Sequence, residues 1–560
     1  MSDHWQSTVF PNEPIFKLLL EAARENRHVA VSDSIRGVNA SYAQLLVDIC
    51  TMHEEIRKRI PQSMFDARGL MPLEATCIFI LGPASYVFIL ASFTALSLGG
   101  AICPLGTGAS PSDAYRLLQK TQSSIILADP LYLNHALEIK KYADGEGTDL
   151  YVVPTTFNIA SSESPLNFNV EINQDLVVEQ TRPGLFISTS GTTGPPKLVI
   201  HGRGVFVPGA GYQSGDVFLC HRSPVWFGGL RPLISVVLAR AKLRIVARDA
   251  SVIWESLRSD QITFLSTVPA VWTQLMEYYQ SHISKLAREQ AETYRQGVQN
   301  LRRAIVSSSS LLPSVQTFWV DKMQRPLMVV YGATELGGAA LVRASAPFPD
   351  EARRIGKPSP GVLVKLSEGD HGQLLIKSPL AFLRYHGNPE ATENAFDKDG
   401  YYKSDDFAHR EGDEYILDGR MIDYIRYYGY KIMTHEVEAP MAVLPYISEA
   451  CVLAVPVANN AFTTERVGAL VRLQSSHLIP SNSPCWDCRS TLERLRTDLS
   501  RDLAFHMLPT VVHLLHDGEQ IPRTVSEKVN RREVVEKYFK PGSFNLLQDV
   551  KVWDFKCQNS

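Results

Sequence analysis

The chain has 560 residues, of which 45% are hydrophobic and 21% are charged. These fractions are close to globular averages and exclude disordered, collagen-like and fibrous classes. At about 150 residues per domain, the length allows three or four folding units. Lysine and arginine number 56 against 59 acidic residues, so the net charge is −3. This balance argues against a nucleic-acid binder that works by counterion release, and eight cysteines are too few for a secreted disulfide scaffold.

No targeting signal is recognised in the residues at either end of the sequence. The first residues, MSDHWQSTVFPNEP, include acidic residues and lack an apolar core, so no signal peptide is expected. The last residues, Gln558–Ser560, are not an SKL-type peroxisomal signal. The expected location is therefore cytoplasmic.

An uncharged stretch from Ala75 to Ser112 is long enough to cross a bilayer. Glycines and prolines interrupt it, so no membrane span is expected. The stretch instead predicts a buried strand at Thr76–Leu81, a buried helix at Tyr86–Leu98 and a second buried strand at Ala101–Leu105.

Strand-like apolar runs alternate with helix-length segments through the first four hundred residues. This alternation predicts an α/β protein in which helices cover parallel sheets. The expected strands are Ser124–Ala128, Leu150–Val153, Leu185–Ser188, Leu243–Val246, Phe264–Ser266, Ala304–Ser307 and Leu327–Val330. The expected helices are Asp113–Thr121, Ile253–Ser259, Ala270–Gln280 and a polar stretch near Ile283–Arg302.

From Gly361 the pattern changes to short strands with polar turns, at Val362–Leu366, Gln373–Ile376 and Tyr415–Leu417. This predicts a small β-rich subdomain. A smaller α+β unit is expected to follow, so the chain divides into an N-terminal domain at 1–420, a C-terminal domain at 421–540 and a tail at 541–560.

Cys485 and Cys488 form a single CxxC pair. A zinc site would need two more ligands, and no second pair lies nearby. A surface insertion flanked by Pro480 and Pro484 is the simpler expectation.

The segment from Thr189 to Lys197 reads TSGTTGPPK and follows a short apolar run. Small residues allow close backbone approach, hydroxyls and N–H groups donate hydrogen bonds, and lysine adds charge, which suits a polyphosphate. It is not a Walker loop, because Leu198 follows the lysine. Composition alone would also fit a linker.

This segment resembles the phosphate loop of the adenylate-forming, AMP-binding superfamily, which includes acyl-CoA synthetases, luciferases and peptide-synthetase adenylation domains. Further matches occur in the family's order between about Ser41 and Arg532. They are VYGATE at 330–335, YKSDD at 402–406, GRMID at 419–423, YGYKI at 428–432 followed by EVE at 436–438, and PRTVSEKV at 522–529. The resemblance implies an N-terminal adenylation domain and a mobile C-terminal domain that carries a catalytic lysine.

The resemblance also implies a two-step reaction with ATP, Mg²⁺ and CoA. A carboxylate attacks the α-phosphate of ATP, and a thiol then attacks the acyl carbon of the acyl-adenylate. Cations and directed donors must therefore gather where negative charge accumulates.

Roles follow for residues that match the family's motifs. Lys528 would bridge the carboxylate and the α-phosphate, Thr334 would contact the α-phosphate, and Glu335 would hold Mg²⁺. The implied phosphate loop consists of Thr189, Ser190, Gly191, Thr192, Thr193, Gly194 and Lys197. The implied adenine and ribose residues are Tyr331, Gly332, Asp406 and Arg420.

The second step implies a domain rotation. The hinge would be Met421, Ile422 and Asp423, and the thioester step would use Gly429 and Lys431. Two departures from the family pattern stand out: Glu527 precedes Lys528 where the family has glycine, and Asp405 precedes Asp406 where the family has glycine.

The implied acyl pocket includes Trp226, Phe227, Val268, Trp272 and Gly337. The family's histidine is absent from the segment at 223–230, and so is the aspartate that would meet an α-amino group, which argues against amino-acid substrates. Ser307–Ser310 replaces a glycine-rich strand end. Arg231 could pair with a second carboxylate, although a surface position is the simpler expectation.

A carboxylate–CoA ligase is thus the expected function. Two alternatives remain: an acyl-AMP ligase that loads a separate carrier protein, and a nucleotide-binding homologue that has lost catalysis. A luciferase-like oxygenase would share the same motifs.

Overall fold

The computed structural model describes most of the chain. The described residues are 8–25, 28–73, 76–156, 170–189, 197–209, 211–309, 311, 313–344, 353–420, 424–427, 430–456, 465–474, 488–516, 518–523, 529–539 and 550–553.

The first large sheet has seven strands in the order β20-β10-β9-β5-β4-β6-β7. Strands β9, β5, β4, β6 and β7 are parallel, whereas β10 and β20 are antiparallel to their neighbours. The bounds are β4 (Cys77–Leu81), β5 (Ala101–Leu105), β6 (Ile125–Ala128), β7 (Tyr151–Pro154), β9 (Pro183–Ser188), β10 (Leu198–Gly202) and β20 (Arg384–Tyr385). The nearby helices are α3 (Tyr86–Ser97), α4 (Pro111–Thr121) and α5 (Leu133–Gly145).

The uncharged stretch of the sequence forms the centre of this sheet. Every residue of α3 is buried, as are β4 and β5, so the absence of charge reflects burial on all sides. Among the described residues, no helix is long and apolar enough to cross a membrane. The expected strand, helix and strand are confirmed.

The second large sheet has thirteen strands in the order β18-β19-β21-β22-β17-β16-β15-β14-β13-β11-β12-β2-β3. Its central strands β2, β12, β11, β13, β14 and β15 are parallel. The central bounds are β2 (Val29–Asp33), β3 (Val38–Ser41), β11 (Val217–Cys220), β12 (Lys242–Ile245), β13 (Phe264–Thr267), β14 (Arg303–Ser307), β15 (Met328–Tyr331) and β16 (Leu341–Arg343). The remaining strands are β17 (Arg354–Pro358), β18 (Leu363–Leu366), β19 (His371–Lys377), β21 (Tyr402–Glu411) and β22 (Glu414–Arg420).

The short strands expected as a small subdomain therefore continue the larger sheet. On one face of its parallel part pack α7 (Ala250–Ser259), α8 (Pro269–Ser281) and α9 (Arg288–Gln299). The stretch expected as one polar helix is a 3₁₀ turn at Ile283–Lys285 followed by α9. Helix α6 (Phe227–Leu238) lies on the other face, beside α3 and α1 (Pro14–Glu25).

The N-terminal segment is tied to the rest of the chain by strand pairing. Strand β1 (Thr8–Asn12) pairs in parallel with β8 (Val170–Val177), and α2 (Tyr42–Arg59) packs against α3. The short helices α10 (Pro313–Thr317) and α11 (Pro389–Asn394) lie in connections.

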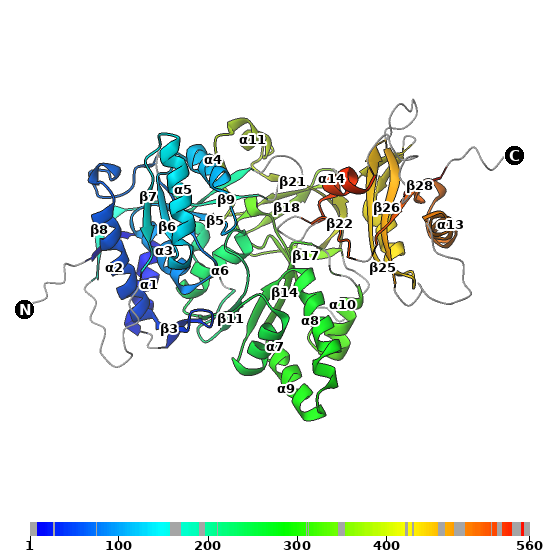
Figure 1. Cartoon of the computed structure of the whole chain (residues 1–560), viewed down its shortest axis with the longest axis horizontal. Coiled ribbons are helices and arrows are strands. Elements are labelled where there is room, and N and C mark those ends of the chain that lie inside the picture. The colour runs from blue at the N-terminus through cyan, green and yellow to red at the C-terminus, as the bar shows by residue number, and fades with distance from the viewer. Residues whose placement is uncertain are drawn as a thin grey trace, which may run out of the picture.

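The C-terminal part is an α+β unit at the end of the molecule opposite to the N-terminus (Figure 1). Its sheet has the order β25-β26-β27-β28 and is preceded by the hairpin β23-β24. The bounds are β23 (Tyr424–Tyr427), β24 (Tyr430–Met433), β25 (Ile447–Pro456), β26 (Glu465–Leu473), β27 (Val511–Leu514) and β28 (Val550–Val552), with α12 (Thr434–Ala442), α13 (Cys488–Leu499) and α14 (Arg531–Val534). The expected fold class is confirmed.

Candidate active site

One part of the candidate site lies at an edge of the second sheet. Strands β11, β13, β14 and β15 run in the same direction, so their carboxyl ends meet there. Open α/β sheets bind ligands outside the carboxyl ends of their strands. Arg222, Val268, Ser308 and Gly332 follow these four ends closely.

The neck of the glycine-rich loop is an antiparallel hairpin. The N–H of Thr189 donates to the carbonyl of Lys197 (2.9 Å), and the N–H of Lys197 donates to Oγ1 of Thr189 (3.1 Å). These bonds close the loop at the ends of β9 and β10. The loop itself, with Ser190, Gly191, Thr192, Thr193 and Gly194, lies outside the described residues.

Tyr385 connects this neck to Glu335. Its hydroxyl donates a hydrogen bond of 2.9 Å to Oε1 of Glu335, and Nζ of Lys197 lies 4.6 Å from the centre of its ring. Glu335 is buried in the 3₁₀ turn Thr334–Leu336. Burial and the charge of Glu335 raise the pKa of the Tyr385 hydroxyl, which therefore remains a donor. Sequence reasoning missed Tyr385 because its place depends on the pairing of β20 with β10.

The position of Glu335 fits a metal ion that takes most of its ligands from phosphate. Among the described residues, no three His, Cys, Asp or Glu side chains cluster as a metal site. Mg²⁺ usually takes one or two carboxylates together with phosphate oxygens and waters. A single buried carboxylate beside the neck of the loop agrees with that pattern.

The nucleoside end of the site has an acceptor carboxylate. Tyr331 Oη donates to Oδ2 of Asp406 (2.5 Å), and Asp406 is buried. Asp405 is exposed and has φ of 60°, a conformation that favours glycine, so the two acids point into different surroundings. Arg420 lies opposite Asp406 in the pairing of β21 and β22. A Cβ on Gly332 would lie 2.7 Å from the carbonyl oxygen of Gly338, so only glycine fits.

Two of the expected acyl-pocket residues serve packing instead. Trp272 is fully buried among α7–α9, and its indole N–H donates to the carbonyl of Ile305 (3.0 Å). Gly337 has φ of 70°, and a Cβ there would lie 2.0 Å from the carbonyl oxygen of Leu380. Glycine is thus needed for close backbone approach and not for pocket space. Trp226, Phe227 and Val268 are half-buried and remain available to line a pocket.

His201 on β10 is a buried neighbour of Phe227 that sequence reasoning missed. The two rings lie 5.2 Å apart, and the imidazole is 0% exposed. Among the described residues, neither ring nitrogen has a partner at hydrogen-bonding geometry, although the backbones of Thr334 and Leu380 are near enough to act on its pKa. Burial lowers the pKa of His201 to about 4, against the opposing effect of those backbones.

Two arginines near the start of α6 are half-buried. Arg231 donates from Nε to the carbonyl of Val205 (2.8 Å), so the expected surface position is wrong. Arg222 lies against Gly228 in the first turn of the helix. The end of β14 is also unusual, because Ser308 has φ of 81°.

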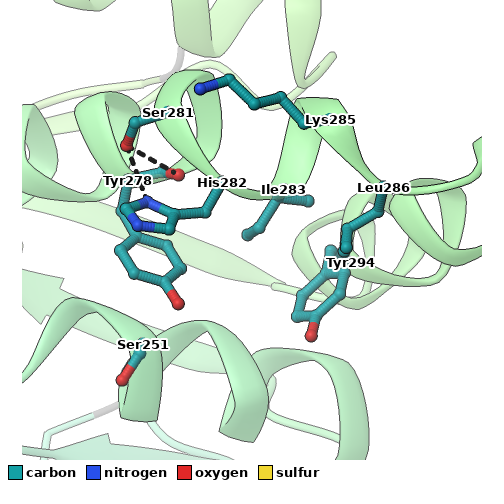
Figure 2. Close-up of a pocket in the computed structure, with 8 residues that line it drawn as sticks. All are labelled: Ser251, Tyr278, Ser281, His282, Ile283, Lys285, Leu286 and Tyr294. Carbon is teal, nitrogen blue, oxygen red and sulfur yellow. Dashed lines mark hydrogen bonds between the residues drawn. The ribbon is translucent and has the colours of Figure 1, made fainter.

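A separate surface pocket lies among α7, α8 and α9 (Figure 2). Its lining is Ser251, Tyr278, Ser281, His282, Ile283, Lys285, Leu286 and Tyr294. The Ser281 hydroxyl and Nδ1 of His282 are 2.8 Å apart there. None of the predicted site residues that the structure describes lines this pocket.

The remaining predicted residues belong to the C-terminal part. Lys528 lies in 524–528, outside the described residues, between Arg523 and Val529, which pair as an antiparallel bridge. Met421, Ile422, Asp423, Gly429 and Cys485 also lie outside the described residues. Lys431 lies in β24, opposite Arg426.

Comparisons with known proteins agree with these features. The family model of AMP-binding enzymes matches residues 63–386. The acyl-CoA ligase oryP of Aspergillus oryzae is 31% identical over 95% of this chain and 93% of its own. A malonate–CoA ligase of Arabidopsis thaliana is 26% identical over 83% of this chain and 78% of its own. The ATP-bound structure of MatB from Rhodopseudomonas palustris is similar with a TM-score of 0.73 at 19% identity, covering 93% of this chain and 99% of that one.

Proposed function

The chain belongs to the AMP-binding enzyme family and is an acid–thiol ligase, and we propose that it joins a carboxylic acid to CoA through an acyl-adenylate. One observation carries the proposal: Tyr385 holds a cation, Lys197, and a buried carboxylate, Glu335, beside the neck of the glycine-rich loop. This arrangement suits a nucleoside triphosphate with its magnesium ion.

In the first step a carboxylate oxygen of the acid bonds to the α-phosphorus of ATP, and the bond to the β-phosphate oxygen breaks to release pyrophosphate. The loop at 189–194 and Lys197 would bind the outer phosphates. Thr334 would donate to the α-phosphate, and Lys528 would neutralise charge between the two reacting anions. Mg²⁺ held at Glu335 would offset phosphate charge.

In the second step the thiol of CoA loses its proton, its sulfur bonds to the acyl carbon, and AMP leaves. We place Gly429 and Lys431 at this step, after rotation of the C-terminal unit about 421–423. The naming of the Aspergillus relative as an acyl-CoA ligase supports CoA over a carrier protein as the acceptor.

The test is pyrophosphate release with ATP, Mg²⁺ and a panel of aliphatic, aromatic and dicarboxylic acids, with and without CoA. Products are identified by mass spectrometry. We expect release with one class of acid and an acyl-CoA mass only when CoA is present. Release that leaves only acyl-adenylate in the presence of CoA would favour carrier loading instead.

A Lys528→Ala variant separates the two steps. It should lose pyrophosphate release by orders of magnitude, yet still convert a supplied acyl-adenylate to acyl-CoA. If the unaltered protein instead binds ATP but releases no pyrophosphate with any acid of the panel, that result would favour the alternative of a nucleotide-binding homologue that has lost catalysis.

A further inference from the structure

A contact between Arg353 and His435 joins residues on either side of the proposed hinge at 421–423. Arg353 comes directly before β17 of the N-terminal domain, and His435 lies in the first turn of α12 in the C-terminal unit. Nη1 of Arg353 lies 2.5 Å from Nε2 of His435. Because a guanidinium can only donate, the imidazole accepts this hydrogen bond and is neutral. A rotation about 421–423 would move the two partners relative to each other.

The backbone of Arg353 is fixed to the strand that leads to the hinge. The N–H of Leu417, in β22, donates to the carbonyl of Arg353 (2.9 Å), and the next residue, Arg354, lies opposite Ile416 in the pairing of β17 and β22. Arg353 is exposed, and among the described residues its guanidinium bonds only to His435. The N-terminal domain therefore presents this cation to the C-terminal unit.

His435 also packs against the last residues before the hinge. A Cβ built on Gly419, which has φ of 141°, would lie 3.1 Å from Nδ1 of His435 and 2.0 Å from Cε of Met433. Two side chains that follow the hinge thus fill the space beside a glycine that precedes it. This packing and the bond to Arg353 hold the start of α12 in one position on the N-terminal domain.

The charges around His435 keep it an acceptor. Burial, followed by the charge of Arg353, lowers the pKa of His435 to about 4. Arg531 acts in the same direction, and Asp418 acts in the opposite direction. At neutral pH the ring is therefore uncharged and able to accept from Arg353.

The same end of α12 binds Arg531, which follows Lys528 by three residues. Nη2 of Arg531 donates to Oγ1 of Thr434 across 3.2 Å. Thr434 is the residue before His435 in α12. The chain just after the lysine of the first step is thus bound to the end of α12 that His435 connects to the N-terminal domain, which links the contact to that step.

We propose that the bond between Arg353 and His435 is a latch, which holds the C-terminal unit in the orientation of the first step and has to break before the second step. Both are positioning residues, because they act through the placement of the C-terminal unit and not on the substrate. The inference rests on the proposed function, since it requires the two steps and the rotation between them.

The experiment measures the two steps separately in a single turnover. The first step is read as pyrophosphate release with ATP, Mg²⁺ and an acid that the unaltered enzyme accepts. The second step is read as acyl-CoA formed from CoA and the supplied acyl-adenylate of that acid. Arg353→Met should slow the first step by about 10-fold, as expected for the loss of a hydrogen bond to a charged group. The second step should be unchanged or faster, which also shows that the variant is folded.

An exchange of charges tests the latch itself. His435→Lys places a second cation opposite Arg353, so it should slow the first step as well. The double variant His435→Lys with Arg353→Glu restores an attractive pair of reversed polarity and should recover most of the lost rate. Arg410→Met is the matched control, because Arg410 lies in β21 of the same sheet and pairs with Asp370 of the same domain.

Four outcomes would overturn the inference while leaving the ligase function intact. They are an unchanged first step in Arg353→Met, an equal loss in both steps, a loss confined to the second step, and a double variant no faster than His435→Lys. A loss confined to the second step would assign the contact to the other orientation. Absence of pyrophosphate release from every acid would instead overturn the proposed function, and this inference with it.

Discussion

The hydroxyl of Tyr385 donates a hydrogen bond to Oε1 of Glu335 across 2.9 Å. The same ring lies 4.6 Å from Nζ of Lys197, so one tyrosine contacts both charged groups at the neck of the phosphate loop. Tyr385 comes from β20, a strand of two residues that is held by its pairing with β10. The position of the carboxylate thus depends on a residue far from it in the sequence.

Replacing Tyr385 by phenylalanine removes the hydrogen bond and keeps the ring beside Lys197. A hydrogen bond to a charged group contributes about 1.5–3 kcal/mol, so we expect a loss of at least about 10-fold in kcat/KM together with a raised Mg²⁺ requirement. The measurement is pyrophosphate release as a function of Mg²⁺ concentration. Tyr446→Phe is the matched control, because its hydroxyl bonds Asp498 at the same distance, 2.9 Å, in the C-terminal unit. An unchanged Mg²⁺ dependence in Tyr385→Phe would remove the tyrosine from this role.

Asp406→Asn should weaken the recognition of ribose. A carboxylate only accepts hydrogen bonds, which suits the two ribose hydroxyls, whereas an amide also presents donors. We expect the unaltered enzyme to prefer ATP over 2′-deoxyATP and the variant to lose most of that preference, with kcat/KM for ATP reduced about 10-fold. Tyr331→Phe removes the 2.5 Å bond to Asp406 but leaves the carboxylate, so it should keep the preference. Equal discrimination in Asp406→Asn would contradict the assignment.

Local sequence patterns predicted the helices and strands well. The site residues that were missed are positioned by strand pairing in the folded chain. The uncharged run at 75–112 contains apolar runs that predicted β4, α3 and β5. The prediction succeeded because these segments are buried on all sides. Trp272 was expected in the acyl pocket, but the face of α8 that carries it points into the core. Tyr385 and His201 lie on paired strands, and no local pattern reveals that pairing.

Gly337 illustrates a second limit. Its glycine was interpreted as room for the acyl group, whereas its φ of 70° and the carbonyl of Leu380 require it. The same ambiguity applies to Asp405 and Ser308, which adopt glycine-like angles without being glycine. A sequence shows where the small residues are, but it does not show which atoms they lie against in the folded chain.

His201 should make the protein less stable in mild acid. Its pKa is lowered to about 4 by burial, so between the ordinary value of 6.5 and about 4 the unfolded chain binds a proton that the folded chain does not. Stability therefore falls as pH decreases through that window, by up to about 3 kcal/mol from this group. His201→Leu should flatten the decline of Tm between pH 6.5 and 4.5. Buried His53 and His221, whose pKa values are lowered to about 3, would account for the decline that remains.

The control for this prediction is His371→Asn, since His371 is exposed. Its Tm profile should match that of the unaltered protein. If the Tm of His201→Leu declines with falling pH as steeply as the Tm of the control, the imidazole is already protonated in the folded state or does not resist protonation.

Arg203→Met should destabilise the N-terminal domain strongly. Arg203 and Glu13 are each 1% exposed, and Nε of Arg203 lies 2.6 Å from Oε2 of Glu13. The guanidinium also donates to the carbonyls of Gly100 (2.8 Å) and Leu96 (2.6 Å), so it connects the N-terminus, the start of β5 and the segment after β10. Removing it leaves a buried carboxylate without a counter-charge, which typically costs about 3–5 kcal/mol.

The measurement is urea denaturation followed by circular dichroism, read from the transition of the N-terminal domain. Arg240→Met is the comparison, because its pairs with Glu21 and Glu25 are exposed and should contribute less than about 1 kcal/mol. The double variant Glu13→Gln with Arg203→Met should recover part of the loss, since the amide carries no charge to compensate. Equal stabilities for Arg203→Met and Arg240→Met would mean that water reaches Glu13 and that the pair does not hold the N-terminal segment.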